Sequence, residues 1–562
     1  ISSGSWFPVF RSGDFDPEKA QRDAITIQNY YRDRGFLDAE VGYETEFEDV
    51  ARERLTLTFR VNEGTRYTIR EILVEGNSDA VFTDDELLGA MELEAGSFFN
   101  NIRLRTDVTN LLTKYGSVGY IEAQITPTWV YATEPDQVVV TIEVREGGQF
   151  EVGFIEVNGN FRTKEKTVRR ELRFYPEEIY DVTKLRDAEK RLKDTGLFSE
   201  ARIEPIGTQS RVRDAVVTVV ENTKTNQFMA GAGATSNDGL VGNISLVNTN
   251  FDISDVPRSW GEFFKGRSFR GAGQTMRIQF EPGTQFTRFR IDFREPYFLN
   301  RPIGFNAGIF GFERGRSGHT ERRLGGTVSF DKRFEEGLLR NWMGEIAFTI
   351  LEVWVLDRQA FAAKDIRDVD GANFEPSVKF TLAHDTTDSR LDPSRGHRLQ
   401  VAYEQFYGDH LFGRATADFV KHFTVAVDDQ DRKSVVSLRA SGGQTLGDVP
   451  LYERFYAGGI GSFRGFDFRG ISPRQGLRNN KVGGDFMALA GAEYSFPLWA
   501  KAVRGVFFAD MGTVESDFGI NSWRASVGAG VRLTLDLLGG VPMEFDLAFP
   551  ISKKSEDNVR IF

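Results

Sequence analysis

The chain contains no cysteine and no long apolar run. Without cysteine it can form no disulfide, no thiolate metal site and no thiol nucleophile. A membrane-spanning helix needs about 20 mostly apolar residues in a row, and no such run occurs, so none is predicted. Basic residues are outnumbered by acidic ones, 70 against 82, and the net charge of −12 argues against a nucleic-acid binder. The start at Ile1 lacks the features of a signal peptide, so we expect a mature or trimmed product.

Groups that commonly carry catalysis are sparse. The sequence has no nucleophile elbow, and the glycines between residues 231 and 239 precede neither a helix nor a phosphate-binding Lys-Ser or Lys-Thr pair. Asp385, Asp388 and Asp392 resemble an acidic catalytic cluster, but Pro393 beside them indicates a turn. The five histidines are scattered without metal-ligand spacing: His319, His384, His397, His410 and His422. The sequence therefore predicts no enzyme, no catalytic residue, no metal site and no cofactor.

An internal repeat occupies residues 1–222. The stretch YTIREILVEGN at 67–77 is echoed by FEVGFIEVNGN at 150–160, an offset of 83 residues. Each copy continues with helical patterns and then two alternating strands, and NYYRDRGFLDAEV from Asn29 belongs to a third, partial copy. The sequence predicts α+β modules of order β-α-α-β-β at residues 1–66, 67–148 and 149–222, the first of them incomplete.

After residue 222 the pattern becomes a two-residue alternation interrupted by Gly, Asp, Asn and Pro. In QTMRIQF at 274–280, apolar and polar side chains alternate between the two faces of a strand. The expected strands begin near Asn226, Gly239, Gly271, Gln285, Pro302, Arg322, Leu339, Ala372, His397, Leu411, Lys433, Gly484, Ala502, Ser522, Val541 and Asp557. Sixteen antiparallel strands predict a transmembrane β-barrel at residues 223–562, with a soluble β-sandwich as the alternative.

One long loop, residues 446–480, carries the glycine-rich stretch GGIGSFRGFDFRG. A sixteen-stranded barrel has a wide lumen that an inward-folded loop can plug and brace. Arg464 suits that role because a guanidinium group can bridge two carboxylates through paired hydrogen bonds. Arg469 lacks a following aromatic residue, so we interpret it as a solvated loop arginine.

The first and last predicted strands are both weak. The first, NQFMAGAGAT at 226–235, has two glycines and three alanines, so few side chains fix its register. The last, 557–562, is about half as long as a spanning strand. We therefore expect a lateral seam with an exposed edge, which an unfolded strand can join, although glycine in a strand more often reflects twist alone. The seam candidates are Gln227, Phe228, Met229, Ala230, Gly231, Arg560, Ile561 and Phe562.

The connection at residues 248–270 is longer than the short periplasmic turn expected after a second strand. Trp260, Phe263 and Phe264 lie there among several cationic residues. Aromatic rings interleaved with cations suit the headgroup region of a membrane, which predicts an interfacial segment. A lid packed against the last module is the alternative.

Several short motifs carry a family resemblance. The tandem modules, the sixteen strands, ERFYAGGIGSFRGF from Glu453, FFADMGTV from Phe507 and DTTDSRLDPSRGHR from Asp385 together resemble the outer-membrane assembly superfamily, and the modules resemble its POTRA domains. The resemblance covers essentially the whole chain. Residues 1–66, with SWFPVFRSGDF and YYRDRGF, are similar to the third of five POTRA domains, so the modules would correspond to the third, fourth and fifth.

The resemblance also implies a set of contacts for the loop. In that superfamily the arginine of the loop motif contacts acidic residues on the inner barrel wall, which by motif match are Glu493 and Asp510. Gly465 would let the backbone approach closely. Phe463 and Phe466 would fill the space around the ion pair, with Phe463 standing where Val or Ile is commoner.

The function implied by the resemblance is that of the central subunit of an outer-membrane protein insertase. Such a subunit folds and inserts β-barrel clients through a lateral seam by strand augmentation. The implied partners are unfolded outer-membrane β-barrel proteins, periplasmic chaperones, accessory lipoproteins and membrane lipids, but no nucleic acid. The implied location is the outer membrane of a diderm bacterium, with the POTRA domains in the periplasm. A translocation-and-assembly paralogue and a two-partner secretion exporter are the alternatives within the superfamily.

Overall fold

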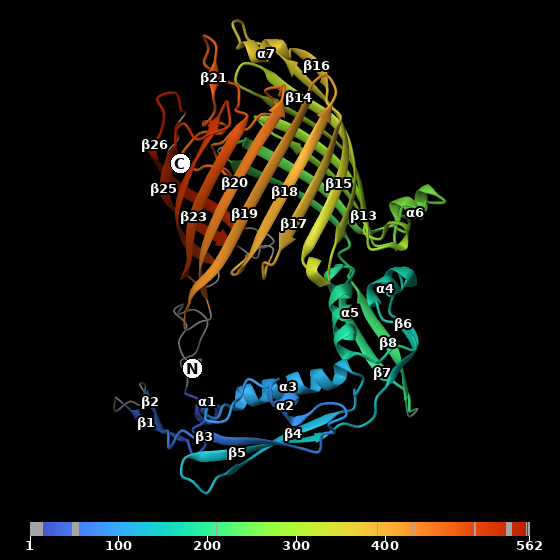
Figure 1. Cartoon of the computed structure of the whole chain (residues 1–562), viewed down its shortest axis with the longest axis vertical. Coiled ribbons are helices and arrows are strands. Elements are labelled where there is room, and N and C mark those ends of the chain that lie inside the picture. The colour runs from blue at the N-terminus through green and yellow to red at the C-terminus, as the bar shows by residue number, and fades with distance from the viewer. Residues whose placement is uncertain are drawn as a thin grey trace. The chain divides into compact units, whose positions relative to one another are not determined.

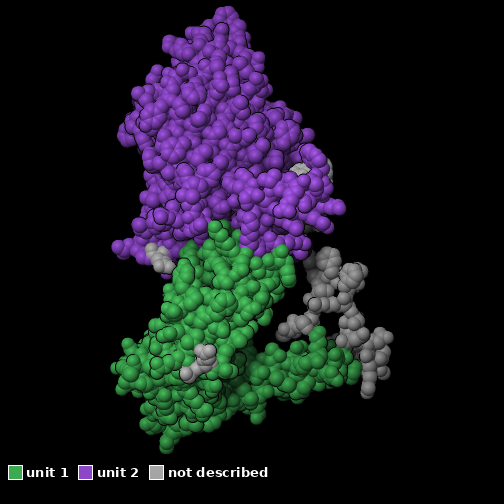
Figure 2. Space-filling view, turned by 90° about the vertical axis from the view of Figure 1, so that its right-hand side faces the viewer, with its two compact units in different colours: residues 1–161, 165–221 green, residues 162–164, 222–562 purple. Residues whose placement is uncertain are grey.

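The computed structural model describes residues 15–47, 55–208, 211–235, 237–335, 337–389, 392–428, 432–499, 502–534, 542–557 and 559. The chain divides into two compact units, which Figure 2 draws in green and purple. Unit 1 comprises residues 1–161 and 165–221, and unit 2 comprises residues 162–164 and 222–562. None of the helices among the described residues is both long enough and apolar enough to cross a membrane.

Unit 1 contains three α+β modules in succession. The first has α1 (Pro17–Arg32), β1 (Glu40–Phe47) and β2 (Leu55–Asn62). The second has β3 (Thr68–Glu75), α2 (Asp84–Leu88), α3 (Asn101–Ser117), β4 (Gln124–Tyr131) and β5 (Gln137–Arg145). The third has β6 (Glu151–Asn158), α4 (Glu165–Leu172), α5 (Val182–Asp194), β7 (Phe198–Ile206) and β8 (Val212–Glu221). The second and third modules follow the order β-α-α-β-β.

Each complete module is a three-stranded sheet covered by two helices. The last strand lies in the middle, so the orders are β3-β5-β4 and β6-β8-β7. In β5 the alternating residues Val138, Val140 and Ile142 are fully buried, because one face of the sheet packs on the helices. The helices begin at side-chain caps: Asn100 accepts a hydrogen bond from the Arg103 amide at α3, and Asp181 accepts from the Thr183 amide at α5.

Unit 2 is a large antiparallel sheet that curves into a barrel (Figure 1). Its strands are β9 (Asn226–Thr235), β10 (Gly239–Phe251), β11 (Gln274–Pro282), β12 (Phe286–Glu295), β13 (Gly304–Gly315), β14 (Thr320–Arg333), β15 (Trp342–Leu356), β16 (Gly371–Phe374), β17 (Ser377–Asp385), β18 (Gly396–Tyr407), β19 (Leu411–Val427), β20 (Lys433–Gly447), β23 (Phe486–Trp499), β24 (Val503–Glu515), β25 (Arg524–Thr534) and β26 (Pro542–Ser552). These sixteen strands confirm the predicted fold class. The sheet runs from β26 to β9, and among the described residues no pairing joins these two edge strands.

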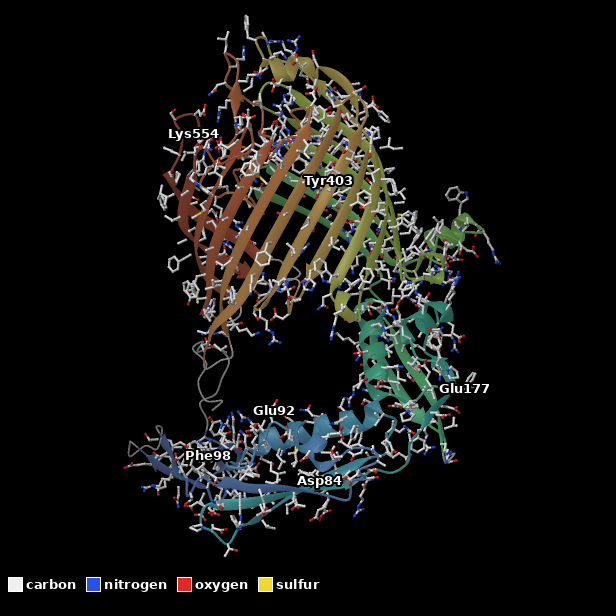
Figure 3. The ribbon with its side chains drawn as sticks, viewed as in Figure 1. Asp84, Glu92, Phe98, Glu177, Tyr403 and Lys554 are labelled. Carbon is white, nitrogen blue, oxygen red and sulfur yellow. The ribbon has the colours of Figure 1, made fainter. Side chains whose placement is uncertain are left out.

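The strands alternate between an apolar outer face and a polar inner face. On β24 and β26 the side chains of Phe507, Met511 and Leu547 are half exposed, whereas Asp510 and Ala548 are buried. Tyr403 marks an outward position on β18 (Figure 3). The alternation that predicted the barrel therefore separates a membrane-facing surface from a lumen.

Two predicted strands differ from the structure. The eighth, expected from Ala372, is divided into β16 and β17 because Pro376 lies between them and has no amide hydrogen to donate. The last, expected at 557–562, falls mostly outside the described residues. Of its described residues, Val559 forms an isolated bridge with Phe466 of the long loop, and the Asp557 carboxylate accepts hydrogen bonds from Arg524 of β25.

Short helices and strands lie in the connections at the two ends of the barrel. The helix α7 (Lys364–Asp368) and the strands β16 and β21 (Arg474–Gln475) lie at one end of the barrel, whereas α6 (Trp260–Phe264) lies near the other (Figure 1). The strand β21 pairs with β22 (Asn480–Lys481). Because β20 ends at Gly447 and β23 begins at Phe486, the long loop spans residues 448–485; it begins two residues later and ends five residues later than the predicted 446–480.

Candidate functional site

Arg464 lies at the centre of a contact between the long loop and the barrel wall. Its Nη1 donates to Glu493 Oε2 of β23 at 2.6 Å, and its Nε and Nη2 donate to the two carboxylate oxygens of Asp510 of β24 at 2.8 and 3.1 Å. The guanidinium carbon lies 3.5 Å from the ring centroid of Phe508, and the side chain is 11% exposed. The structure therefore brings together the arginine and both carboxylates that the motif match paired.

The wall around Arg464 holds three further charged residues that sequence analysis missed. Asp546 of β26 lies 3.5 Å from Arg464 Nη1, Arg439 of β20 donates to Asp510 at 2.6 Å, and Arg532 of β25 donates to both oxygens of Asp546. Three arginines and three carboxylates thus balance in charge. Such a network keeps the loop in one position, because removing one member leaves a buried charge without its partner.

The two phenylalanines of the motif pack beside this network and not around it. Phe463 and Phe466 are fully buried, and their rings meet edge to face at 5.1 Å in an apolar cluster with Phe455 and Ile471. The ring that covers the guanidinium group is Phe508 of the wall. Gly465 has a φ of +88°, and a Cβ there would lie 3.2 Å from Ser526 Cβ, so the loop approaches β25 closely only with glycine.

A second contact with reversed charge holds the start of the loop. The Glu453 carboxylate is 3% exposed and accepts hydrogen bonds from Arg323 of β14 at 2.8 Å and from Arg414 of β19 at 2.6 Å. Arg323 also donates to the Tyr452 carbonyl at 2.7 Å. Glu453 is the first residue of the motif ERFYAGGIGSFRGF, which carries the family resemblance. Its role became apparent only from the structure, because its partners Arg323 and Arg414 lie far from it in the sequence.

Arg469 is not the solvated arginine that we predicted. Its guanidinium carbon lies 3.9 Å from the ring centroid of Tyr456. The backbone of Arg469 has a φ of 54°, a conformation uncommon for residues other than glycine. The prediction failed because the absence of a following aromatic residue says nothing about an aromatic side chain earlier in the loop.

Of the predicted seam residues, the structure describes those of the first strand, β9, and not those at the C-terminus. All ten residues of β9, which include Gln227, Phe228, Met229, Ala230 and Gly231, are exposed, and β9 pairs with β10 in continuous register. Arg560, Ile561 and Phe562 lie outside the described residues. The structure therefore gives the geometry of the first edge of the sheet.

The predicted interfacial segment is a short helix on a firmly held base. Trp260 begins α6 and is 78% exposed. At the base, Phe251 stacks on Phe269 with ring centroids 5.4 Å apart, and the Asp252 carboxylate pairs with Lys164 at 2.5 Å. Phe263 and Phe264 also lie in this helix.

Comparison with known families identifies the architecture. The Omp85 superfamily domain matches residues 268–562, which is more than half of the chain. The chain belongs to the Omp85 superfamily. The POTRA family, described as a surface antigen variable number repeat, matches residues 6–64, 67–147 and 150–222 of this Omp85 protein.

Curated relatives are similar in sequence to most of this chain. The outer membrane protein assembly factor BamA of Nitratidesulfovibrio vulgaris is 26% identical over 532 residues, which cover 92% of this chain and 62% of the relative. BamA of Neisseria meningitidis serogroup B is 23% identical over 622 residues, which cover 100% of this chain and 74% of the relative. This Omp85 chain thus spans less than two thirds of the length of the first of these relatives. It is a protein of the outer membrane, with its POTRA modules in the periplasm.

Solved structures show the same fold. The crystal structure of BamA from Haemophilus ducreyi lacking POTRA domains 1–3 matches with a TM-score of 0.63 at 19% identity, covering 88% of this chain and 98% of that one. CdiB from Acinetobacter baumannii matches with a TM-score of 0.51 at 13% identity over 98% of both chains. Together with the family matches, they confirm the predicted resemblance and the order of POTRA modules followed by a barrel.

Proposed function

We propose that this chain is the central subunit of an outer-membrane protein insertase, which folds β-barrel clients and releases them through the edge of its own barrel. The observation that carries the proposal is β9. This edge strand consists largely of small residues, is exposed along its whole length, and among the described residues pairs with β10 alone. Backbone groups along such an edge are ready to accept an incoming strand. The names of the BamA relatives support this function.

The two edges of the sheet differ in how firmly they are held, which supports a fixed C-terminal edge and a movable β9 edge. Arg464 connects the loop to β23 and β24 by charge-assisted hydrogen bonds and to the edge strand β26 by an ion pair, so these interactions hold the C-terminal edge of the sheet. In β9, by contrast, small side chains from Ala230 to Ala234 offer little packing. A client strand would therefore pair with β9, and the C-terminal edge would stay in place.

Reconstitution tests the proposed function. The chain in phospholipid vesicles should accelerate the folding of a urea-unfolded eight-stranded outer-membrane barrel, measured by heat-resistant electrophoretic mobility and protease protection. Vesicles that contain a plain porin at the same protein density are the control. Equal folding rates in the two kinds of vesicle would contradict the proposal. Uptake of a soluble passenger without barrel insertion would instead support the alternative of a two-partner secretion exporter.

We also propose that α6 lies at the periplasmic membrane interface. Trp260 is exposed at the start of the helix, and its neighbours Phe263 and Phe264 extend the aromatic pattern. Lipid-attached quenchers should reduce the fluorescence of Trp260, measured as the difference between the wild type and Trp260→Phe. Replacement of the three aromatic residues with Ser should weaken the barrel in bilayers. If the quencher leaves Trp260 emission unchanged, the result would favour the alternative hypothesis, in which this segment is a lid packed against the last module.

The modules are proposed to correspond to the third, fourth and fifth POTRA domains of a five-domain relative, at residues 1–66, 67–148 and 149–222. Their proposed partners are periplasmic chaperones, accessory lipoproteins and unfolded client proteins. A pull-down from a periplasmic and membrane extract, with the barrel unit alone as control, would identify partners that need these modules.

A further inference from the structure

The hairpin that joins β9 to β10 is held from inside the barrel by the long loop. Asn237 Nδ2 donates to the Ile460 carbonyl at 3.1 Å, and the Ile460 amide donates back to Asn237 Oδ1 at 3.3 Å. The two groups are 223 residues apart in the chain. The glycine before Ile460 makes room for this pair: Gly459 has a φ of +89°, and a Cβ there would lie 2.3 Å from Asn237 Oδ1.

An arginine on the wall supports the same hairpin. Arg314 of β13 donates to Asp238 Oδ1 at 2.9 Å and to the Asn237 carbonyl at 2.6 Å. Its guanidinium carbon lies 4.0 Å from the ring centroid of Phe468, a residue of the long loop, and its side chain is 10% exposed. Arg314 therefore fixes the hairpin and the loop to each other.

The same stretch of loop, residues 459–468, reaches the other edge of the sheet. Phe466 forms a bridge with Val559, Arg464 lies 3.5 Å from Asp546 of β26, and Ser526 of β25 donates to the Arg464 carbonyl at 2.6 Å. Residues 459–468 thus contact the β9–β10 hairpin on one side and the C-terminal strands on the other. We call this stretch the latch segment.

We propose that the latch segment tethers the β9–β10 hairpin to the C-terminal strands, and that Asn237 must separate from Ile460 before β9 can move away from those strands with a client strand added to it. This inference rests on the proposed insertase function. The two sides of the latch segment differ in strength. On the C-terminal side Arg464 makes several hydrogen bonds to the buried carboxylate of Asp510 and to the half-buried Glu493, whereas the Asn237 pair consists of two neutral, exposed hydrogen bonds. The Asn237 pair is the weaker of these two contacts and is the one that releases first, while the ion pair between Arg314 and Asp238 still ties the hairpin to β13.

Hydrogen exchange tests the release without reference to activity. In the full chain in lipid, Asn237→Ala should speed amide exchange in residues 226–251 by about tenfold, as expected for the loss of two net hydrogen bonds. Ile460→Ala is the matched control, because Ile460 contributes only backbone groups and its side chain is 51% exposed. Unchanged exchange in Asn237→Ala, or an equal rise in the control, would overturn the proposal.

A disulfide across the pair tests the functional step. In the cysteine-free chain, a double variant with Asn237→Cys and Ile460→Cys is oxidised and the disulfide is verified by mass spectrometry; the oxidised form should insert clients at least tenfold more slowly than the wild type. A reductant should restore the rate. Wild-type insertion by a fully oxidised pair would overturn the latch. Inactivity of the wild type in the same assay would instead count against the proposed function.

Discussion

At the scale of single residues, Arg464 joins the loop to three strands of the wall. Replacing it with Ala should destabilise the barrel by about 3 kcal/mol, because Glu493 then loses a charged partner inside the lumen. The stability of Arg464→Lys should lie between those of the wild type and Arg464→Ala, because an ammonium group keeps the charge but cannot bridge two carboxylates in the same plane. Thermal unfolding in detergent measures the effect. The control is Arg322→Ala, which removes an exposed ion pair with Glu313 and should have little effect. Equal losses for Arg464→Ala and the control would contradict this role.

Glu453 should matter to a similar degree at the opposite wall. Glu453→Gln removes the charge that Arg323 and Arg414 share, and a cost of about 2 to 3 kcal/mol is expected for a buried, charge-assisted contact. The same unfolding measurement applies, with Glu313→Gln as the exposed control. A double variant with Arg464→Ala should lose more stability than either single variant. A Glu453→Gln protein as stable as the wild type would show that the start of the loop is held by other contacts.

The sequence predicted part of this network and not the rest, for a physical reason. Arg464, Glu493 and Asp510 were paired by motif match. Strand alternation also places Asp546 and Arg532 on the inner face, but it does not give their height along the barrel. Height depends on the tilt and stagger of strands that are not neighbours, which the closed geometry sets. The contact between Asn237 and Ile460 could not be predicted for the same reason, because the sequence does not give the heights of these residues along the barrel.

At the scale of elements, alternation predicted the strands well, and single residues explain the differences. Pro376 ends β16, and the inward bridge of Val559 with Phe466 replaces part of the last expected strand. The modules were predictable because each one buries one face of its sheet in a regular pattern, as Val138 and Val140 show in β5. The joint between modules was not predictable, because its partners are distant in the chain.

Asp38 is one of the residues that join the first two modules. Its two carboxylate oxygens accept hydrogen bonds from the Tyr67 and Tyr131 hydroxyls at 2.6 and 3.0 Å. Asp38→Ala should speed amide exchange in α1 and β1 several-fold, because it removes both bonds while the module cores stay intact. Asp79→Ala, at an exposed carboxylate of the second module, is the control. Exchange that rises equally in both variants would mean that Asp38 does not hold the joint.

The same joint should respond to high pH. The hydrogen bond to Asp38 is the main reason that the pKa of Tyr67 is raised from 10 to about 12, with burial adding to it. The bond contributes fully below pH 10, and its contribution is lost as the pH rises towards 12. Absorbance of tyrosinate, taken as wild type minus Tyr67→Phe, should titrate with a midpoint near 12, and with a lower midpoint in an Asp38→Ala background. A wild-type midpoint near 10 would contradict the assignment.

At the scale of the whole barrel, the long loop ties early and late strands together across the lumen. Glu453 contacts β14 and β19, Arg464 contacts β23, β24 and β26, and Ile460 contacts the hairpin of β9. The loop is therefore bound to the C-terminal strands by charged groups, whereas its own hydrogen bonds to the β9–β10 hairpin are the neutral pair between Asn237 and Ile460. The account depends on one claim, that a client strand adds to β9.

Cross-linking during insertion tests that claim most directly. A single cysteine at Ala230 of β9, in a chain with no other thiol, is combined with a client that carries single cysteines along its last strand. The account predicts a disulfide at one register during insertion, and none from a matched cysteine at Leu382 on the outer face of β17, which is 48% exposed. Equal cross-linking from Ala230 and Leu382, or insertion with no cross-link to β9, would contradict it.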